Sequence, residues 1–323
     1  MATPLMLERP WSPTATAVAP LVGRLRGRLR TALRGKDEAC DLALACLLAR
    51  GHLLIEDAPG LGKTTLAKAV AGLVGGRFTR IQCTPDLLPT DITGFTIYEQ
   101  HVGRFDFRPG PVFADVLLAD EINRATPRCQ SALLEAMSER QVTIDDTSHP
   151  LAAGFFVVAT QNPLEHLGTY PLPEAQLDRF ALKLRLGAPD RQTEIELLRR
   201  GREPAASEAD DEEPLLDPAG LAAVQEAVAA VPVADRVAAY LVDLGRCCRE
   251  RLGGQRGPSP RALLGWQRLA QAWAVLEGRG HVLPDDVRQV AVPTLGVRLG
   301  LADSEAESLV AAAFEQVPVP VTR

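Results

Sequence analysis

The chain has 323 residues, 46% of them hydrophobic, and a formal net charge of −6. This length and composition fit two ordinary packed domains, and the acidic balance excludes a global electrostatic attraction to nucleic acid. No stretch approaches the roughly twenty apolar residues of a membrane span, and the amino-terminal segment, with Glu8 and Arg9, does not resemble a signal peptide. We therefore expect a cytoplasmic protein without a membrane span.

Residues 1–20 have the proline, threonine and alanine content of a flexible tail. The next segment, from Leu21 to Leu33, places a leucine at every fourth position among arginines, which predicts an amphipathic helix with a solvated basic face. The arginines are Arg24, Arg26, Arg28, Arg30 and Arg34. A second apolar helix is expected from Asp37 to Leu48.

The six cysteines and five histidines show no spacing typical of a metal site. We expect reduced thiols and histidines that lie at the surface or support other residues. The sequence gives no reason to predict a zinc centre or a disulfide framework.

A glycine-rich loop follows the short apolar strand from Leu53 to Ile55 and precedes a predicted helix. This is the layout of a phosphate-binding loop that holds ATP or ADP. The residues expected to bind the nucleotide are Ala58, Pro59, Gly60, Leu61, Gly62, Lys63, Thr64 and Thr65. Lys63 would reach the terminal phosphates and the Thr64 hydroxyl would hold Mg²⁺. Asp57 stands at the position of the first glycine of the motif, and we expect the turn to survive because aspartate tolerates unusual backbone angles.

Two hairpins, at 95–108 and 141–152, are predicted from alternating apolar residues and turn signals. Between them, the continuous apolar run from Val116 to Ala119 is typical of a buried parallel strand and ends in Asp120-Glu121. Asp120 is expected to order Mg²⁺, and Glu121 to deprotonate the water that attacks the γ-phosphate.

Three further side chains are candidates for the same chemistry. Asn162 ends a strand expected to lie between the Asp120 strand and the phosphate-loop strand, where its amide would hold the attacking water or sense the γ-phosphate. An asparagine before a proline is also an ordinary turn residue. Arg179 and Arg261 would supply positive charge near the γ-phosphate, although each is equally well explained as a structural ion pair.

Strands and helices alternate through residues 21–188, which predicts a three-layer α/β/α domain with a parallel sheet. Residues 189–323 are expected to form a helical domain that begins with a solvated acidic linker at about 202–218. The helices expected there are Leu221 to Val231, Ala234 to Leu252, Arg261 to Glu277, Pro284 to Val292 and Ser304 to Phe314.

Three strings of residues give the chain a family resemblance. VLLADEINRA at 116–125, VVATQNPLEHLGTYPLPEAQLDRF at 157–180 and GPSPRALL at 257–264 resemble the MoxR branch of the AAA+ ATPases. The resemblance implies a homo-hexameric ring, an α/β core with a helical lid, and ATP bound between subunits. It also implies that Arg179 acts on the neighbour's nucleotide, that Arg261 reaches ATP in its own subunit, and that both hairpins point toward the centre of the ring.

The implied function is chaperone-like remodelling or maturation of a partner protein, including partners with a von Willebrand factor A domain. One departure from the branch is at 295–299, where similar proteins carry a histidine before the arginine. Three alternatives stay open: a DNA-directed motor, a non-catalytic nucleotide switch or scaffold, and the ATPase subunit of a metal chelatase. The acidic balance and the absence of a basic, aromatic surface count against the motor.

Overall fold

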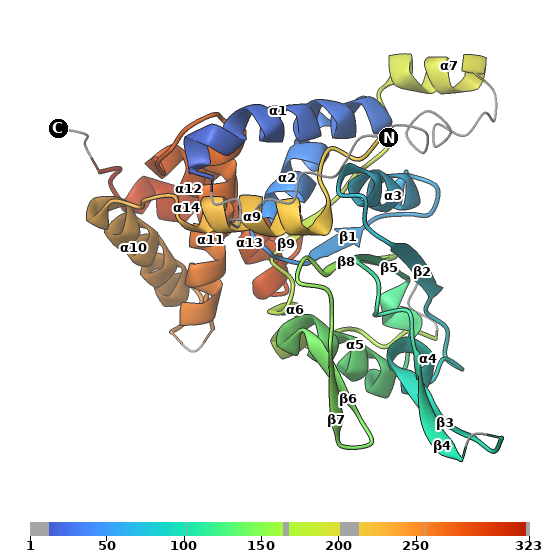
Figure 1. Cartoon of the computed structure of the whole chain (residues 1–323). Helices are drawn as coiled ribbons and strands as arrows, with labels where there is room; N and C mark the ends of the chain where they lie inside the picture. Colours follow the sequence, from blue (N-terminus) through green and yellow to red (C-terminus); the bar gives the residue numbers. More distant parts are fainter. Residues whose placement is uncertain (1–12, 102, 164–167, 201–212, 255, 321–323) are drawn as a thin grey trace.

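The structure is a computed structural model, and it describes residues 13–101, 103–163, 168–200, 213–254 and 256–320. Its central parallel sheet and carboxyl-terminal helices, drawn in Figure 1, confirm the α/β fold with a helical lid that the sequence predicts. Among these described residues, no helix is both long enough and apolar enough to cross a bilayer.

Five parallel strands form the central sheet, in the order β2-β5-β8-β1-β9. They are β1 (Leu53–Glu56), β2 (Phe78–Gln82), β5 (Val116–Asp120), β8 (Phe156–Gln161) and β9 (Leu182–Leu184). Every residue of β5 is buried, which explains why this strand is a continuous apolar run in the sequence. Because all the pairings are parallel, the carboxyl ends of the five strands meet at one edge.

Helices cover both faces of the sheet, because successive side chains of a buried strand point in opposite directions. The face with Leu53 and Ile55 packs in one apolar cluster with α1 (Ala15–Ala32), α2 (Asp37–Leu48) and α3 (Lys63–Leu73). The face with Leu54 packs in a second cluster with α4 (Pro89–Thr93) and α5 (Pro127–Glu139). The two clusters give the three layers predicted from the sequence.

Both predicted hairpins are present, and they extend from the same end of the α/β part (Figure 1). The first pairs β3 (Gly94–Glu99) with β4 (Arg104–Pro109), and the second pairs β6 (Gln141–Ile144) with β7 (Thr147–Pro150). They touch through Phe107 and His149, whose rings are stacked with centroids 4.0 Å apart. The two hairpins are therefore in direct contact.

The helical part begins after β9, and the expected domain boundary at 188–189 falls between β9 and α7 (Arg191–Arg200). The helices that follow are α9 (Pro218–Ala229), α10 (Asp235–Arg251), α11 (Pro260–Leu276), α12 (Pro284–Gln289), α13 (Ala291–Arg298) and α14 (Asp303–Gln316). The sequence analysis missed α13 and predicted one helix across the α12–α13 junction. The chain breaks at Val290 and restarts, so that Pro293, which has no N–H to donate, lies in the first turn of α13.

The acidic linker expected at about 202–218 lies largely outside the described residues, and its described end is exposed at Glu213, Pro214 and Asp217 but packed at Leu216. Leu216 is buried, and the N–H groups of Leu215 and Leu216 donate to the carbonyl of Leu73 at the end of α3. Asp217 caps α9 by accepting from the N–H of Gly220 at 2.6 Å. This end of the segment therefore belongs to the packed structure.

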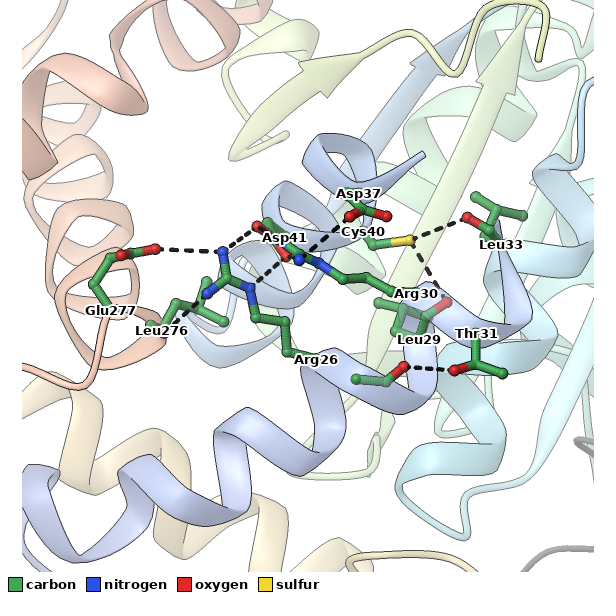
Figure 2. Close-up of polar contacts among 11 residues, drawn as sticks. Arg26, Leu29, Arg30, Thr31, Leu33, Asp37, Cys40, Asp41, Leu276 and Glu277 are labelled. Carbon is green, nitrogen blue, oxygen red and sulfur yellow. Dashed lines mark hydrogen bonds and ion pairs between the residues drawn. The ribbon is translucent and has the colours of Figure 1, made fainter. Parts of the chain in front are cut away.

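The basic face of α1 differs from its prediction. The helix begins at Ala15, within the stretch expected to be a tail, and two of its arginines are only partly exposed and paired with a carboxylate. Arg26 and Arg30 both donate to the buried carboxylate of Asp41 on α2, from their Nε atoms at 2.8 and 3.1 Å (Figure 2). Burial alone would raise the pKa of Asp41, but the hydrogen bonds from the two guanidinium groups outweigh it and lower that pKa.

Arg26 also connects α1 to the helical part of the molecule. Its Nη1 donates to the carbonyl of Leu276 at 3.3 Å and its Nη2 lies 3.3 Å from Oε1 of Glu277, at the carboxyl end of α11 (Figure 2). Helix α1 therefore contacts α2 and the lid through the same guanidinium group. The sequence could not predict this, because Glu277 is 251 residues away.

We expect Asp41→Asn to lower the free energy of unfolding by about 2 kcal/mol, because it leaves two partly buried guanidinium groups without their shared carboxylate. The contribution is fully present above the pKa of an unfolded aspartate, about 3.9, and is lost as the pH falls through the lower pKa of the folded state. Urea unfolding at neutral and acidic pH measures it. Asp37→Asn is the matched control, since Asp37 pairs with the same Arg30 through a side chain that is 60% exposed. An equal loss in both variants would contradict the prediction.

Candidate functional site

The phosphate-binding loop has the expected geometry. Strand β1 ends at Glu56, the loop runs to Gly62, and α3 begins at Lys63. Gly60 and Gly62 have φ angles of +87° and +95°, which side chains other than glycine rarely adopt. A Cβ on Gly62 would lie 3.2 Å from Leu33, at the end of α1, so the loop also packs closely beneath that helix. The backbone N–H groups at the start of α3 are therefore available to an anion, as the motif requires.

Asp57 holds this loop in place, but not for the reason given by the sequence. Its backbone does not have a positive φ. The side chain is buried, and its Oδ2 accepts hydrogen bonds from the N–H groups of Leu186 and Gly187, just after β9. On the inner side of the loop, Nζ of Lys63 donates to the carbonyl oxygen of Asp57 at 2.8 Å. Asp57 therefore ties the phosphate loop to the chain beyond the edge strand.

The carboxylate pair follows β5 and is positioned by Thr160 on the neighbouring strand β8. The fully buried Thr160 hydroxyl donates to Oδ1 of Asp120 at 3.1 Å and accepts from the N–H of Glu121 at 2.9 Å. Oδ2 of Asp120 is paired with Nε of Arg80 at 2.7 Å. One hydroxyl thus fixes both acidic residues relative to β8.

Glu121 is held in an unusual conformation. Its φ and ψ are 56° and 50°, a left-handed geometry that costs a residue with a side chain on the order of 1 kcal/mol. Its Oε2 accepts from Gln82 Nε2 at 2.9 Å and from Arg124 Nη1 at 3.1 Å. Backbone strain that the surrounding contacts maintain is found mainly at functional sites.

Asn162 directly follows the strand that lies between those of the acids and of the phosphate loop, as predicted. This strand is β8, which runs between β5 and β1, and Asn162 is 7% exposed. The preceding residue, Gln161, donates through Nε2 to Glu56 at the end of β1. Asn162 also lines a pocket of about 360 Å³ at this edge, together with Asn123 and Lys183. The structure therefore brings the phosphate loop, the two acids and Asn162 to one edge of the sheet.

Lys183, on β9, joins this edge to the lid. Its buried ammonium lies 3.0 Å from Oε2 of Glu56 and 3.1 Å from Oδ1 of Asp303 in the first turn of α14. It also donates to the carbonyl of Leu301 at 2.9 Å. Glu56 at the end of β1 and Asp303 of the lid are thus both paired with the buried ammonium of Lys183.

The two arginines lie on another side of the molecule. Arg179 follows the short helix α6 (Glu174–Leu177), and its Nη1 donates to Ser138 Oγ on α5. Arg261 is exposed in the first turn of α11, near enough to Arg298 for its charge to lower the pKa of that buried guanidinium, on which burial has the larger effect. Arg298 in turn binds Asp178, the residue before Arg179. These contacts place Arg261 on the Arg179 side.

The other end of α11 is the end near the phosphate loop. It contacts Arg26 of α1, whose last turn leads to Leu33 above Gly62. Since α11 has 17 residues, its two ends are roughly 25 Å apart at 1.5 Å per residue. In this conformation the structure brings Arg261 close enough to Arg298 for its charge to act on that guanidinium.

The remaining polar candidates are structural. All six cysteines are free and buried. His52 is buried and supports neighbouring elements, which is one of the two roles expected for the histidines. Its Nδ1 accepts from the N–H of Val157 at 3.0 Å and its Nε2 lies 3.1 Å from the carbonyl oxygen of Met137. Burial lowers the pKa of His52 to about 3, so it is neutral and connects β8 to α5.

Comparison with known proteins identifies the family. The model of the ATPase family associated with various cellular activities (AAA) matches residues 52–182, and the AAA lid domain matches 249–317. Chaperone MoxR1 of Mycobacterium tuberculosis is 43% identical over 83% of this chain and 72% of its own length. Protein MoxR of Paracoccus denitrificans is 33% identical over 88% of this chain and 92% of its own. The chain belongs to the MoxR type of AAA+ ATPases.

Two further relatives span nearly all of this MoxR-type chain. Uncharacterized protein YeaC of Bacillus subtilis is 43% identical over 94% of this chain and 96% of its own. The crystal structure of a candidate ATPase from Cytophaga hutchinsonii has a TM-score of 0.82 at 34% identity, covering 95% and 97% of the two chains. A full-length MCM homologue from Methanopyrus kandleri, with a TM-score of 0.58 and 21% identity, shares the fold.

Several site residues of the MoxR-type chain were missed from the sequence: Arg80, Gln82, Thr160 and Lys183. Thr160 gave a weak signal, because it is a hydroxyl residue inside an otherwise apolar run. Gln82 and Arg80 are on β2, and only the pairing of β2 with β5 brings them to the acids. No pattern in the sequence predicts that pairing.

We expect Asp57→Gly, which restores the usual glycine, to lower the free energy of unfolding by about 1–3 kcal/mol, because it leaves two N–H groups after β9 without their acceptor. Asp57→Asn retains an acceptor oxygen and should lose much less. Chemical denaturation of the two variants measures the difference. If Asp57→Gly is as stable as the parent chain, the carboxylate does not anchor the loop.

Proposed function

We propose that this MoxR-type chain binds ATP and hydrolyses it to ADP and phosphate with Mg²⁺, and uses the cycle to remodel or mature a partner protein. One observation carries the proposal: Lys63, the Asp120-Glu121 pair and Asn162 converge at one edge of the parallel sheet. Ligands of parallel α/β sheets bind at that edge. Membership of the AAA+ ATPases supports the same reaction.

The phosphates would lie on residues 58–65. The N–H groups of the loop and of the first turn of α3 would donate to them, and Lys63 would exchange the carbonyl of Asp57 for the terminal phosphates. Because that carbonyl is within the loop itself, the exchange needs only a side-chain rotation. The loop is thus ready for an anion without refolding.

The residues present also fit a magnesium ion. The Thr64 hydroxyl and the Asp120 carboxylate are oxygen donors of the kind Mg²⁺ prefers, and Mg²⁺ takes its other ligands from water and phosphate. Among the described residues no group of three or more His, Cys, Asp or Glu side chains could hold an ion, so nucleotide phosphates would complete the set. When bound, the ion would neutralise charge that develops on the phosphates.

Glu121 would accept the proton of the attacking water, and Asn162 would orient that water or the γ-phosphate. Gln82 and Arg124 both bind Oε2 of Glu121 and so control the direction of its carboxylate. A nucleotide that displaces Arg124 or Gln82 would free this oxygen. The left-handed backbone of Glu121, whose N–H donates to the Thr160 hydroxyl, sets the position from which the Glu121 side chain extends.

Arg179 would complete the site of an adjoining subunit in a homo-hexameric ring. The place of Arg261 near Arg298 supports a role for Arg261 in the neighbouring subunit's site as well. This replaces the role in its own subunit that the sequence led us to expect. Both arginines would then stabilise charge on the neighbour's γ-phosphate. A site built in this way is inactive until subunits meet.

For the wider role, we propose a cytoplasmic chaperone-like factor whose partner is a protein, including one with a von Willebrand factor A domain. The support is the relative named Chaperone MoxR1. The two hairpins in mutual contact would face the centre of the ring and meet the partner. The net charge of −6 favours a protein partner over nucleic acid.

Glu121→Gln should bind ATP as tightly as the parent chain and lose turnover by about 100-fold or more, because the amide cannot take a proton from water. Phosphate release and equilibrium binding of a fluorescent ATP analogue measure the two quantities. Glu135→Gln, an exposed glutamate on α5, is the control and should keep full turnover. Unchanged turnover in Glu121→Gln would remove this residue from the role of base and favour a nucleotide switch.

Turnover per subunit should rise steeply with protein concentration in the parent chain, since each site needs a neighbour. Arg179→Ala should lower it by roughly 10³-fold while nucleotide binding persists. Arg236→Ala, which removes an exposed arginine of α10, should behave as the parent does. Flat turnover that is indifferent to Arg179 would contradict a site shared between subunits.

A further inference from the structure

Helix α6, which precedes Arg179, has little packing of its own beyond Leu177, which lies partly buried against the second apolar cluster. It comprises four residues, Glu174–Leu177, and none of them is buried. Short helices are marginal in water unless tertiary contacts hold them. The position of Arg179 therefore depends on the fully buried Phe180 that follows it and on the groups that hold α6 from outside.

Those groups come from the lid and bind both ends of α6. After its last turn, Nη1 of Arg298 on α13 donates to Oδ1 of Asp178 at 2.7 Å and to the carbonyl of Asp178 at 3.1 Å. In its first turn, Glu174 is paired with Arg256, which also donates to the carbonyl of Leu299 at 3.4 Å. Two lid arginines thus contact the helix at its two ends, and the Arg256–Glu174 pair is the more exposed of the two contacts.

Arg298 is the stronger of the two contacts, because it is buried. Its side chain is 7% exposed, and its Nε is enclosed without a hydrogen-bond acceptor. Gly265 on α11 makes room for it: a Cβ there would lie 2.5 Å from Nη2. A buried guanidinium that loses its carboxylate is strongly destabilised, so α13 and Asp178 are expected to move together.

We propose that Arg298 is a positioning residue that sets, through Asp178, the place of Arg179, so that the lid of one subunit controls the arginine offered to the next. This rests on the proposed function of Arg179. Asp178 and Arg179 are consecutive residues, so their Cα atoms stay about 3.8 Å apart and a movement of Asp178 is passed to the backbone of Arg179. A lid movement that shifts α13 would therefore shift the guanidinium of Arg179, and a displacement of about 1 Å costs on the order of 100-fold in rate.

The test uses mixed rings of full-length variants. Arg298→Met should bind ATP as the parent does and lose about 10- to 100-fold in turnover. Its own catalytic residues are intact, and only the arginine that it presents is misplaced. Glu121→Gln has the opposite defect, an inactive site with intact arginines. Adding excess Glu121→Gln should restore turnover by the Arg298→Met subunits toward the parent value, while adding Arg179→Ala should restore none.

The mixture of Arg179→Ala with Glu121→Gln distinguishes a failure of the inference about Arg298 from a failure of the proposed site shared between subunits. If that mixture recovers and the one with Arg298→Met does not, Arg298 does not act through Arg179 and the inference is overturned. If neither recovers, the shared site itself fails. Loss of ATP binding in Arg298→Met would likewise overturn the inference, by assigning the residue to its own site.

Two more variants protect the test from a folding defect. Arg298→Lys keeps the charge opposite Asp178 and should retain more turnover than Arg298→Met. If circular dichroism shows that Arg298→Met does not fold, Arg298→Met with Asp178→Asn replaces it, since removing both members of a buried ion pair is tolerated far better than removing one. This double variant should show the same recovery with Glu121→Gln, and its failure to recover would overturn the inference.

Discussion

The parallel pairing of β8 with both β1 and β5 is the constraint on which the site depends. It brings the ends of three strands to one edge, so that the phosphate loop, the acids and Asn162 become neighbours. Thr160 makes this pairing chemically specific, because its single hydroxyl contacts both Asp120 and Glu121. A one-residue shift of β8 would turn Thr160 to the other face and leave Asp120 and Glu121 unsupported.

Charged side chains, and not apolar contacts alone, connect the α/β part to the lid. Arg26 joins α1 to the end of α11, Lys183 joins β1 and β9 to α14, and Arg298 joins α13 to the chain before Arg179. Each has a defined carboxylate partner, and ion pairs of this kind are sensitive to geometry because losing a partner is costly when the charge is buried. A lid held in this way has few acceptable positions, which suits an element that must report the state of the site.

The same arrangement gives each end of α11 a different neighbour. The carboxyl end contacts Arg26 of α1, and the amino end carries Arg261, whose charge acts on Arg298. A rigid helix that touches both sides transmits a displacement from one to the other. In the proposed ring, this one helix would link binding at the phosphate loop of one subunit to the arginines that it presents to the next.

The sequence by itself determined the fold class, the phosphate loop, the acidic pair and most of the helices, though not the break that separates α12 from α13. These follow from local information: apolar runs, glycine positions and helical periodicity. It also placed the strand of Asn162 correctly between the other two. The tertiary structure decided which polar side chains meet. Asp57 is an anchor and not a tolerant turn residue, Arg26 and Arg30 are paired with Asp41, and His52 is a buried core residue. Such contacts join residues up to 251 positions apart, and no local pattern encodes them.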